Sequence, residues 1–380
     1  MPNISLKNLL ARSAVEESVS MECAPKTFAG LPLYGLILVV IGAIILLTVL
    51  ILELVLLPKR RKLNKEIKKN LLTHAVVTGG SSGIGLAVAK ELVKNDCKYI
   101  TLIARNESKL NQAKEELDAY VTTNDKKSII QVYSVDVGVV DKVTKAAEDI
   151  CTSNDVPCPT MLFNVAGTSS SAAFVSTDFQ EFERLMNINY LGTAYVTRAF
   201  LPYMMKKEGT DENHPRSIMF TSSQAGQLGV FGYTAYSASK YALKGLAEAL
   251  QMEVGRENIT IQLSFPPDTD TPGFEEENKD KPEETRLISE TSGLFSAEQV
   301  ASKMVTSALQ KRPPFNVYFG LEGWMLANLT AGMSPVHSIL DAIVQIFFKG
   351  LLRFISLFYL FDFRNIVHKV GKKRRAEKSE

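Results

Sequence analysis

The stretch Thr78-Gly79-Gly80-Ser81-Ser82-Gly83-Ile84-Gly85 decides the fold of this chain. It follows the short apolar run 75–77 and precedes residues 86–94, which have the pattern of a helix. A glycine loop between a strand and a helix lets the backbone approach a pyrophosphate, which the N–H groups at the helix N-terminus can bind. We therefore interpret the loop as a dinucleotide-binding turn rather than a glycine turn without a ligand, although its spacing differs from G-x-G-x-x-G.

Downstream of the loop, short apolar runs alternate with longer amphipathic stretches up to about residue 265. The runs at 99–103, 130–135, 161–163 and 218–221 have the composition of buried strands. This alternation predicts an α/β fold of the Rossmann type, a doubly wound parallel sheet with helices on both faces. Right-handed crossovers would then place the ligand crevice at the carboxyl ends of the strands.

The second informative stretch is Tyr236-Ser237-Ala238-Ser239-Lys240, which puts a phenol and an ammonium four residues apart on one helix face. Alone, this spacing is common and indicates only a solvated lysine above a half-buried tyrosine. A nearby ammonium favours the phenolate and lowers the pKa of a tyrosine toward the working pH. Tyr236 is therefore a candidate general acid or base, and Ser223, at the end of the run 218–221, adds a hydroxyl.

Taken together, these stretches resemble the short-chain dehydrogenase/reductase family in their order and spacing. The resemblance implies hydride transfer from a nicotinamide to a carbonyl carbon. Tyr236 would give a proton to the oxygen, Lys240 would hold the ribose, and Ser223 would stabilise the developing alkoxide. It also implies that Asn189 holds a water in a proton relay. Ser222 is the alternative to Ser223, because an error of one residue at a strand end is easily made.

The cofactor site implied by the resemblance draws on several segments of the chain. Arg105 stands at the end of the second strand, where NAD enzymes usually have an acidic residue. A guanidinium suits a 2′-phosphate instead, so we predict NADPH, with an ordinary surface arginine as the alternative. Pro267 replaces the glycine of the family's Pro-Gly turn, which leaves Thr269 and Thr271 both open as nicotinamide contacts. The predicted cofactor-binding residues are Gly79, Ser81, Ser82, Gly83, Ile84, Gly85, Arg105, Lys109, Asp136, Val137, Asn164, Ala166, Gly167, Tyr236, Lys240, Pro266, Thr269 and Thr271.

The N-terminal region predicts a membrane anchor. Residues 1–30 have a mixed composition, whereas 31–57 contain a single charge, Glu53, and are long enough to cross a bilayer, which takes about 20 residues. A cleaved signal peptide is the alternative, but its apolar core is usually shorter and lies nearer the N-terminus. The linker 58–72 is basic, so the positive-inside rule predicts a luminal leader and a catalytic domain facing the cytosol.

The catalytic domain is expected to span residues 73–335, with a charged lid at about 272–295 or, as the alternative, a solvated surface helix. Residues 336–366 are apolar but carry interrupting charges, which favours an interfacial helix or a shallow hairpin over a clean span. Core packing or a dimer face is the alternative. The basic tail 367–380 suits anionic lipid headgroups, making membrane lipid a predicted partner, with a plain solvated tail as the alternative.

Composition excludes little by itself. The 380 residues carry a net charge of +2, which gives no indication of nucleic acid binding. Four cysteines without a C-x-x-C pair and four scattered histidines predict no metal site.

A narrower resemblance rests on residues 223–229, 246–253, 266–274 and 284–290, which are similar to the 3-ketodihydrosphingosine reductases within the family. It implies reduction of a long-chain sphingoid ketone at the endoplasmic reticulum membrane. A retinoid or steroid dehydrogenase, or a non-catalytic dinucleotide-binding scaffold, are the alternatives. A homo-oligomer is left open.

Overall fold

The computed structural model describes residues 27–28, 31–32, 65–205 and 215–377. The chain divides into two units, residues 1–63 and 64–380. In the first unit, β1 (Thr27–Phe28) pairs antiparallel with β2 (Leu31–Pro32). The rest of the predicted leader, anchor and basic linker up to residue 64 lies outside the described residues.

The second unit is built on a parallel sheet of seven strands in the order β11-β8-β7-β6-β3-β4-β5. The chain runs outward from β3 through β4 to β5 and then returns to β6 on the other side of β3. Doubly wound sheets form their ligand crevice at such a reversal. The strands are β3 (His74–Thr78), β4 (Tyr99–Ala104), β5 (Ile129–Ser134), β6 (Met161–Asn164), β7 (Arg216–Thr221), β8 (Ile259–Ser264) and β11 (Asn316–Val317).

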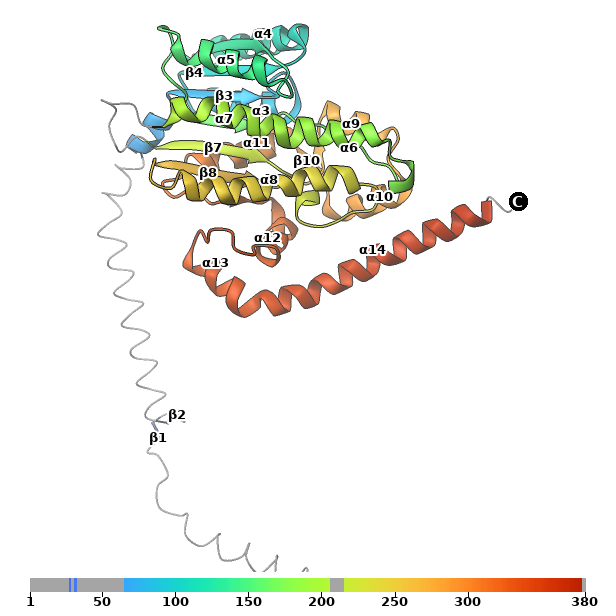
Figure 1. Ribbon diagram of the computed structural model, residues 1–380. Helices are drawn as coiled ribbons and strands as arrows, with labels where there is room; N and C mark the ends of the chain where they lie inside the picture. The colour runs from blue at the N-terminus through green and yellow to red at the C-terminus, as the bar shows by residue number, and fades with distance from the viewer. Residues whose placement is uncertain (1–26, 29–30, 33–64, 206–214, 378–380) are drawn as a thin grey trace, which may run out of the picture. The chain divides into compact units, whose positions relative to one another are not determined.

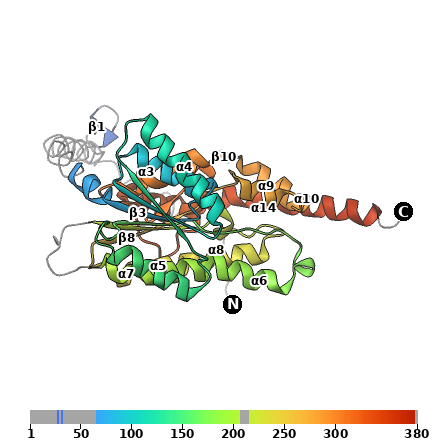
Figure 2. The same ribbon diagram turned by 90° about the horizontal axis from the view of Figure 1, so that it is seen from above.

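Helices cover both faces of the sheet, as the two views in Figures 1 and 2 show. One face carries α3 (Gly83–Lys94), α4 (Glu107–Thr123) and α11 (Ala297–Ala308); the other carries α5 (Val140–Thr152), α7 (Gly192–Met204) and α8 (Thr234–Glu253). Successive strand residues alternate between the two cores, so Val77 and Leu102 pack on the α3 side, whereas Val76 and Ile103 pack on the α5 side. A strand buried on both faces needs a continuous apolar run, which is the pattern in the sequence. The predicted doubly wound fold is confirmed.

Short elements surround the carboxyl ends of the strands. The segment expected to be a lid forms two short helices, α9 (Pro272–Asn278) and α10 (Glu283–Ser289), followed by the single turn η5 (Glu290–Ser292). It is bracketed by β9 (Thr269–Asp270) and β10 (Phe295–Ser296), which pair in parallel. The other short elements are η2 (Phe174–Ser176), α6 (Phe179–Leu185), the π-helical turn η3 (Met186–Leu191) and η4 (Gln224–Gly226).

The C-terminal region begins with α12 (Gly320–Leu329) and ends in one long helix. This helix consists of α13 (Ile339–Ile343), the π-helical turn η6 (Val344–Phe348) and α14 (Lys349–Glu377). The shallow hairpin expected as one possibility for 336–366 is therefore wrong, since the segment has no proline to break it. The predicted tail beginning at residue 367 is likewise helical as far as Glu377.

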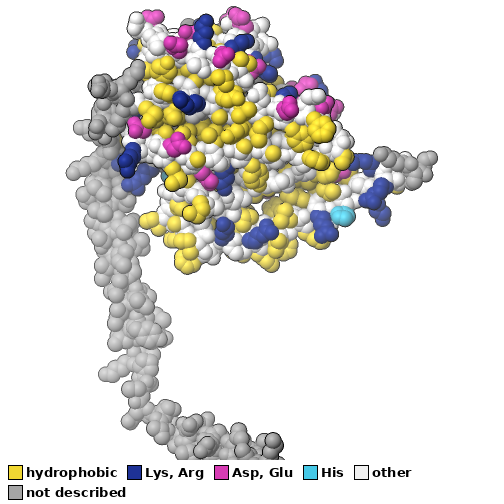
Figure 3. All heavy atoms as spheres, viewed as in Figure 1, with side chains coloured by type: hydrophobic (Ala, Val, Ile, Leu, Met, Phe, Trp, Pro, Cys, Tyr) yellow, Lys and Arg dark blue, Asp and Glu magenta, His cyan; other side chains and the backbone are white. Residues whose placement is uncertain are grey.

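Most of this helix is exposed. Among the described residues, 339–377 form the one helix whose length and composition would allow it to cross a membrane, and 6% of its most apolar window is buried. Figure 3 shows apolar side chains along it with Lys and Arg interspersed. Its exposed apolar residues include Ile339, Leu340, Ile346, Phe347, Phe348, Leu351, Phe354, Phe358 and Phe361. Such a surface is compatible with membrane association.

Candidate active site

A cavity of about 600 Å³ lies at the carboxyl ends of β6, β7 and β8. Its lining includes Gly167 after β6, Thr221 and Ser223 at the end of β7, and Tyr236 and Lys240 on α8. We call it the Tyr236 cavity. Segments more than seventy residues apart in the chain meet here because parallel strands end at the same edge of the sheet.

Tyr236 and Lys240 lie one helical turn apart, with Lys240 Nζ 5.7 Å from the centre of the Tyr236 ring. Lys240 is 5% exposed, and its Nζ donates to the Thr221 carbonyl at 2.9 Å. Lys240 is therefore a buried lysine, and not the solvated one that the spacing alone indicates. Burial lowers the pKa of Lys240 to about 8.

The Tyr236 phenol is stabilised in its protonated form. Burial raises its pKa, the Glu277 and Asp268 carboxylates raise it further, and the Ser223 hydroxyl lowers it. The expected net lowering of this pKa toward the working pH is thus wrong for this arrangement, because desolvation of the phenolate outweighs the effects that lower it. A protonated phenol is the state that a proton donor must have before it reacts.

The two neighbouring serines have different surroundings. Ser223 Oγ accepts from the Ala225 N–H at 3.2 Å and lies close enough to the phenol to affect the pKa of Tyr236. Ser222 is 3% exposed, and its Oγ donates to the Lys240 carbonyl at 3.0 Å. The geometry favours Ser223 as the hydroxyl available to a substrate and gives Ser222 a packing role.

Asn189 lies close to Lys240. It lies in η3, where its Nδ2 donates to Ser239 Oγ and to the Thr168 carbonyl, both at 2.9 Å. A Cβ on Gly167 would lie 3.1 Å from Asn189 Oδ1 and 3.3 Å from Lys240 Nζ, so the amide and the ammonium flank the same glycine. The water relay through Asn189 stays a prediction.

The glycine loop forms a close backbone turn at the start of α3. Gly79 has φ +69°, a conformation that residues with a side chain rarely adopt. A Cβ on Gly85 would lie 2.2 Å from the Gly79 carbonyl oxygen, so only glycine lets the turn pack against the helix. Ser81 and Ser82 flank the start of α3, which begins at Gly83, and Ile84 reaches the Tyr236 cavity.

The residues expected near the adenosine lie farther along the sheet edge, after β4 and β5, outside the lining of the Tyr236 cavity. Arg105 and Lys109 are exposed there. Asp136 uses Oδ1 to accept from the Gly138 N–H at 2.9 Å, while Val137 is buried. A dinucleotide is long enough to join such separated groups, so this placement fits the predicted division of roles.

The end of β6 offers an unused acceptor. Asn164 is buried, its Nδ2 donates to Thr197 Oγ1 at 3.2 Å, and its Oδ1 has no partner among the described residues. The next two amides, of Val165 and Ala166, both donate to Thr78 Oγ1 at 3.1 Å and fasten this edge to the glycine-loop strand. A buried acceptor without a partner beside a glycine cradle fits a bound dinucleotide.

Pro266, Thr269 and Thr271 all line the Tyr236 cavity. Thr269 Oγ1 donates to the Pro267 carbonyl at 2.8 Å and holds the turn together. Thr271 faces the glycine loop, since a Cβ on Gly83 would lie 3.1 Å from its methyl carbon. Of the two threonines left open by the sequence, Thr271 is the one that the fold places beside the cofactor loop.

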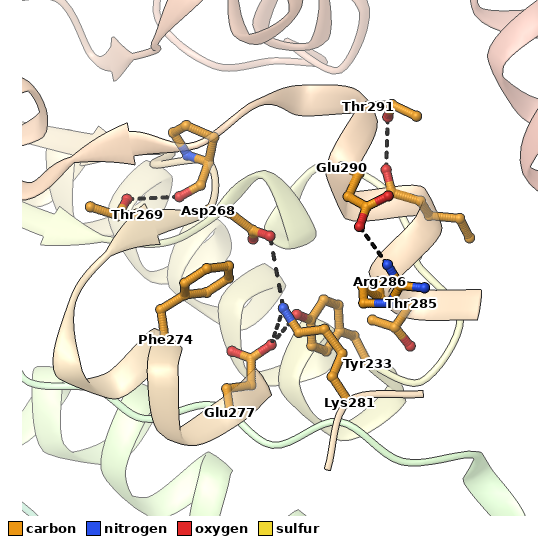
Figure 4. A network of polar contacts seen from close by, with 12 residues as sticks. Tyr233, Asp268, Thr269, Phe274, Glu277, Lys281, Thr285, Arg286, Glu290 and Thr291 are labelled. Carbon is orange, nitrogen blue, oxygen red and sulfur yellow. Dashed lines mark hydrogen bonds and ion pairs between the residues drawn. The ribbon is translucent and has the colours of Figure 1, made fainter. Parts of the chain in front are cut away.

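Sequence reasoning missed a group of charged and polar residues beside Tyr236. Figure 4 shows Tyr233, Asp268, Phe274, Glu277 and Lys281 pointing toward one another. The Tyr233 hydroxyl donates to the Glu277 carboxylate, and burial raises the pKa of that tyrosine. Tyr233 could have been predicted from the sequence, because it stands three residues before Tyr236 and therefore on the same helix face. The other residues of this group come from segments distant in the sequence, and no local pattern connects them to Tyr236.

A second hollow, of about 690 Å³, lies between α12 and α14. Its lining is mostly apolar and includes Met325, Leu326, Leu352 and Leu360; we call it the α12–α14 groove. Leu228 and Phe363 line both this groove and the Tyr236 cavity, so the two hollows share a boundary. Across the part of the chain that the structure describes, no cluster of His, Cys, Asp and Glu could hold a metal ion.

Comparisons with known proteins agree with this geometry. The family model described as short chain dehydrogenase matches residues 73–282. A 3-dehydrosphinganine reductase of Danio rerio is 48% identical over 339 residues, covering 87% of this chain and 95% of that protein. A 3-ketodihydrosphingosine reductase of Mus musculus is 48% identical over 299 residues, which are 78% of this chain and 86% of that protein.

More distant proteins are also similar to this chain. A 3-dehydrosphinganine reductase of Arabidopsis thaliana is 36% identical over 79% of this chain and 86% of its own length. The crystal structure of a short-chain dehydrogenase from Streptomyces avermitilis aligns with a TM-score of 0.54 and 26% identity, over 67% of this chain and 90% of that one. With the sheet order, the glycine turn and the Ser-Tyr-Lys group in place, the chain belongs to the short-chain dehydrogenase family.

Proposed function

We propose that this protein is an NADPH-dependent ketoreductase that converts 3-ketodihydrosphingosine to dihydrosphingosine in sphingolipid synthesis. The observation that carries the substrate class is the boundary shared by the Tyr236 cavity and the α12–α14 groove. A long-chain ketone needs a polar reaction site next to an apolar channel for its hydrocarbon tail. The relatives described above carry the names of sphingoid reductases, and those names agree with this substrate.

The chain's own residues supply the proton transfer and the positioning. Bound NADPH supplies a hydride to the carbonyl carbon. Tyr236 holds a proton on its phenol oxygen, consistent with its raised pKa, and transfers it to the substrate oxygen. The Ser223 hydroxyl donates a hydrogen bond to the same oxygen as negative charge develops there. Lys240, next to Tyr236, provides positive charge beside the resulting phenolate and a donor for the ribose.

NADPH rather than NADH is supported by the residues around the end of β4. Arg105 is exposed there and no acidic side chain stands at its position or the one before it. A guanidinium can pair bidentately with a 2′-phosphate, whereas an acidic residue at this point would repel it. Lys109, also exposed, stands in the first turn of α4, four residues after Arg105.

We further propose that the enzyme works at the endoplasmic reticulum membrane with its catalytic unit in the cytosol. The exposed apolar helix 339–377 would lie in the lipid interface, and its lysines and arginines would contact anionic headgroups. The Asn-x-Ser/Thr sequons at Asn106 and Asn258 test the orientation, because only a luminal domain could acquire sugar there.

The function is tested by NADPH oxidation in membranes that carry the full chain. The membranes are offered 3-ketodihydrosphingosine, retinal and a ketosteroid in turn, with a Tyr236→Phe variant as control. We expect oxidation with the sphingoid ketone, reduced by about 10²–10⁴-fold in the variant, which keeps the ring but loses the proton. Activity on retinal or the ketosteroid alone would keep the chemistry and reject the substrate. NADPH binding without turnover of any ketone would support the scaffold alternative.

A further inference from the structure

A buried charged cluster beside the Tyr236 cavity supplies neither the hydride nor the proton of the proposed reaction. Lys281 Nζ lies 3.0 Å from Glu277 Oε1 and 3.8 Å from Asp268 Oδ2. The side chains are 2% exposed for Lys281, 8% for Glu277 and 26% for Asp268. Figure 4 shows the lysine ammonium between the two carboxylates, with the Phe274 ring beside it.

The charges of this cluster do not balance. Two carboxylates face one ammonium, which leaves a net charge of −1 in a largely buried place. An uncompensated charge is expensive to bury. Burial accordingly raises the pKa of Asp268, with Glu277 acting in the same direction and Lys281 against it. One more cation at this point would complete the pairing.

The cluster is adjacent to the reacting group. Asp268, Glu277 and Tyr236 all line the Tyr236 cavity. Tyr233 links them, because its hydroxyl donates to Glu277 while its ring centre lies 5.3 Å from that of Tyr236. A cation that approaches the two carboxylates from the cavity is therefore next to the carbonyl that Tyr236 protonates.

An independent observation points to a polar ligand in the same place. Ser171 is 8% exposed and lines the Tyr236 cavity, yet its Oγ has no partner among the described residues. The following residue, Ala172, donates its N–H to the Gly232 carbonyl at 2.9 Å, which holds this serine beside Tyr233. Buried hydroxyls are normally paired, so an unpaired hydroxyl on a residue that lines a cavity indicates a missing hydrogen-bond partner.

We propose that Glu277 and Asp268 bind a primary ammonium on the carbon next to the carbonyl, and that Ser171 bonds the adjacent hydroxyl of the same head group. The inference rests on the proposed function and makes the enzyme selective for amino ketones. A sphingoid ketone has this head group, with an amine on the carbon between the ketone and a terminal hydroxymethyl. Retinal and ketosteroids have no amine and would leave the buried negative charge unpaired.

The first test needs no mutation. Membranes carrying the full chain reduce either 3-ketodihydrosphingosine or an analogue in which hydrogen replaces the amino group, with chain length and hydroxyl unchanged. We expect kcat/KM to be at least about tenfold higher for the amino ketone, the size of effect typical of a charge-assisted contact. Equal kcat/KM values for the two ketones would overturn the inference, and reduction of neither would instead reject the proposed function.

The second test asks whether the two carboxylates cause the preference for the amino ketone. Glu277→Gln and Asp268→Asn are compared with Glu290→Gln, which removes an exposed carboxylate on the same segment that pairs with Arg286. We expect the first two variants to reduce the preference for the amino ketone, measured as the ratio of the two kcat/KM values, by about tenfold through KM. Both carboxylates also raise the pKa of Tyr236, but a change in proton transfer acts on both ketones and cancels in this ratio. Glu290→Gln should leave the preference unchanged. An equal loss on both ketones in both cluster variants would mean that the cluster only holds α9 in place.

Discussion

Arg374, near the end of α14, donates from Nη2 to Glu284 Oε2 in α10 at 2.8 Å. The Glu284 side chain is 2% exposed, whereas that of Arg374 is 48% exposed. The same short helix lines the Tyr236 cavity through Ile288 and Ser289. This pair therefore ties the C-terminal helix to a wall of the candidate active site, and a buried carboxylate depends on it.

Arg374→Ala should loosen α10. Loss of the partner leaves Glu284 buried without compensation, at a cost of about 1–2 kcal/mol once the exposure of the arginine is allowed for. Hydrogen exchange of residues 283–289 should quicken and KM for the ketone should rise. Arg375→Ala is the matched control, because its Nε donates to Gly371 within α14. Identical exchange in the two variants would show that the pair does not hold α10.

Substitution of the two serines should give different defects. Ser223→Ala removes the hydroxyl beside the phenol and should lower kcat by about 10²-fold, as loss of an oxyanion donor does. Ser222→Ala removes the buried bond to the Lys240 carbonyl and should cost about 1 kcal/mol of unfolding free energy with a smaller change in kcat. Steady-state kinetics and denaturant titration of both variants measure the two effects. A larger kcat loss for Ser222→Ala would show that Ser222, and not Ser223, is the catalytic serine.

Arg105→Ala should weaken NADPH binding and spare NADH. Loss of a charge-assisted contact to the 2′-phosphate is worth about 1.5–3 kcal/mol, or roughly 10- to 150-fold in KM for NADPH. Lys114→Ala serves as control, because it removes an exposed charge of α4 that pairs with Asp118. If KM for both cofactors changed equally, Arg105 would be an ordinary surface residue.

Two glycine substitutions should have opposite effects on stability. Gly85→Ala would place a Cβ 2.2 Å from the Gly79 carbonyl oxygen, so the turn must shift, and we expect loss of nucleotide binding with a destabilisation of about 1–3 kcal/mol. Gly245→Ala, exposed in α8 with no atom within 4 Å of the new Cβ, should stabilise by up to about 1 kcal/mol. Thermal unfolding with and without NADPH measures both. A nucleotide-induced stabilisation of Gly85→Ala equal to that of wild type would contradict the prediction.

His74 should make the fold sensitive to acid. Its ring is fully buried at the start of β3, with Nδ1 2.7 Å from the Pro157 carbonyl and Nε2 2.9 Å from Thr101 Oγ1, and burial lowers its pKa to about 4. The unfolded chain then binds a proton between pH 6.5 and about 4 that the folded chain excludes, so stability falls as pH falls through this window, by about 3 kcal/mol in all.

Denaturant titration of His74→Gln at pH 7 and pH 4.5 checks whether His74 causes the acid sensitivity. The variant should be less stable at pH 7 but should lose less stability between the two values than wild type does. His337→Gln, at an exposed histidine, should keep the wild-type dependence. An unchanged pH dependence in His74→Gln would show that another titrating group causes the acid sensitivity.

Much of the fold and the reaction chemistry could be read from local patterns. The runs at 99–103 and 161–163 correspond to β4 and β6 within one residue at each end, because a strand buried on both faces requires continuous apolar residues. Tyr236 and Lys240 were recognisable because four residues of helix always bring two side chains to one face. Both signals depend on neighbours along the chain.

The assignments that failed or stayed open depended on distant contacts. The choice between Ser222 and Ser223 required the position of the Lys240 carbonyl, and the pKa of Tyr236 required its burial beside Glu277 and Asp268. The long C-terminal helix was ambiguous because its charges suit an interface, a hairpin turn or a packed surface equally well.

The sequence by itself thus determined the doubly wound fold and the glycine turn and singled out the proposed reacting groups, since each follows from periodicity or a spacing within a few residues. Only the tertiary structure decided the shape and charge of the substrate site. Asp268, Glu277 and Lys281 meet Tyr233 because β8, α9 and α8 converge at one edge of the sheet. Burial and net charge there are properties of the packed arrangement, which no single segment carries.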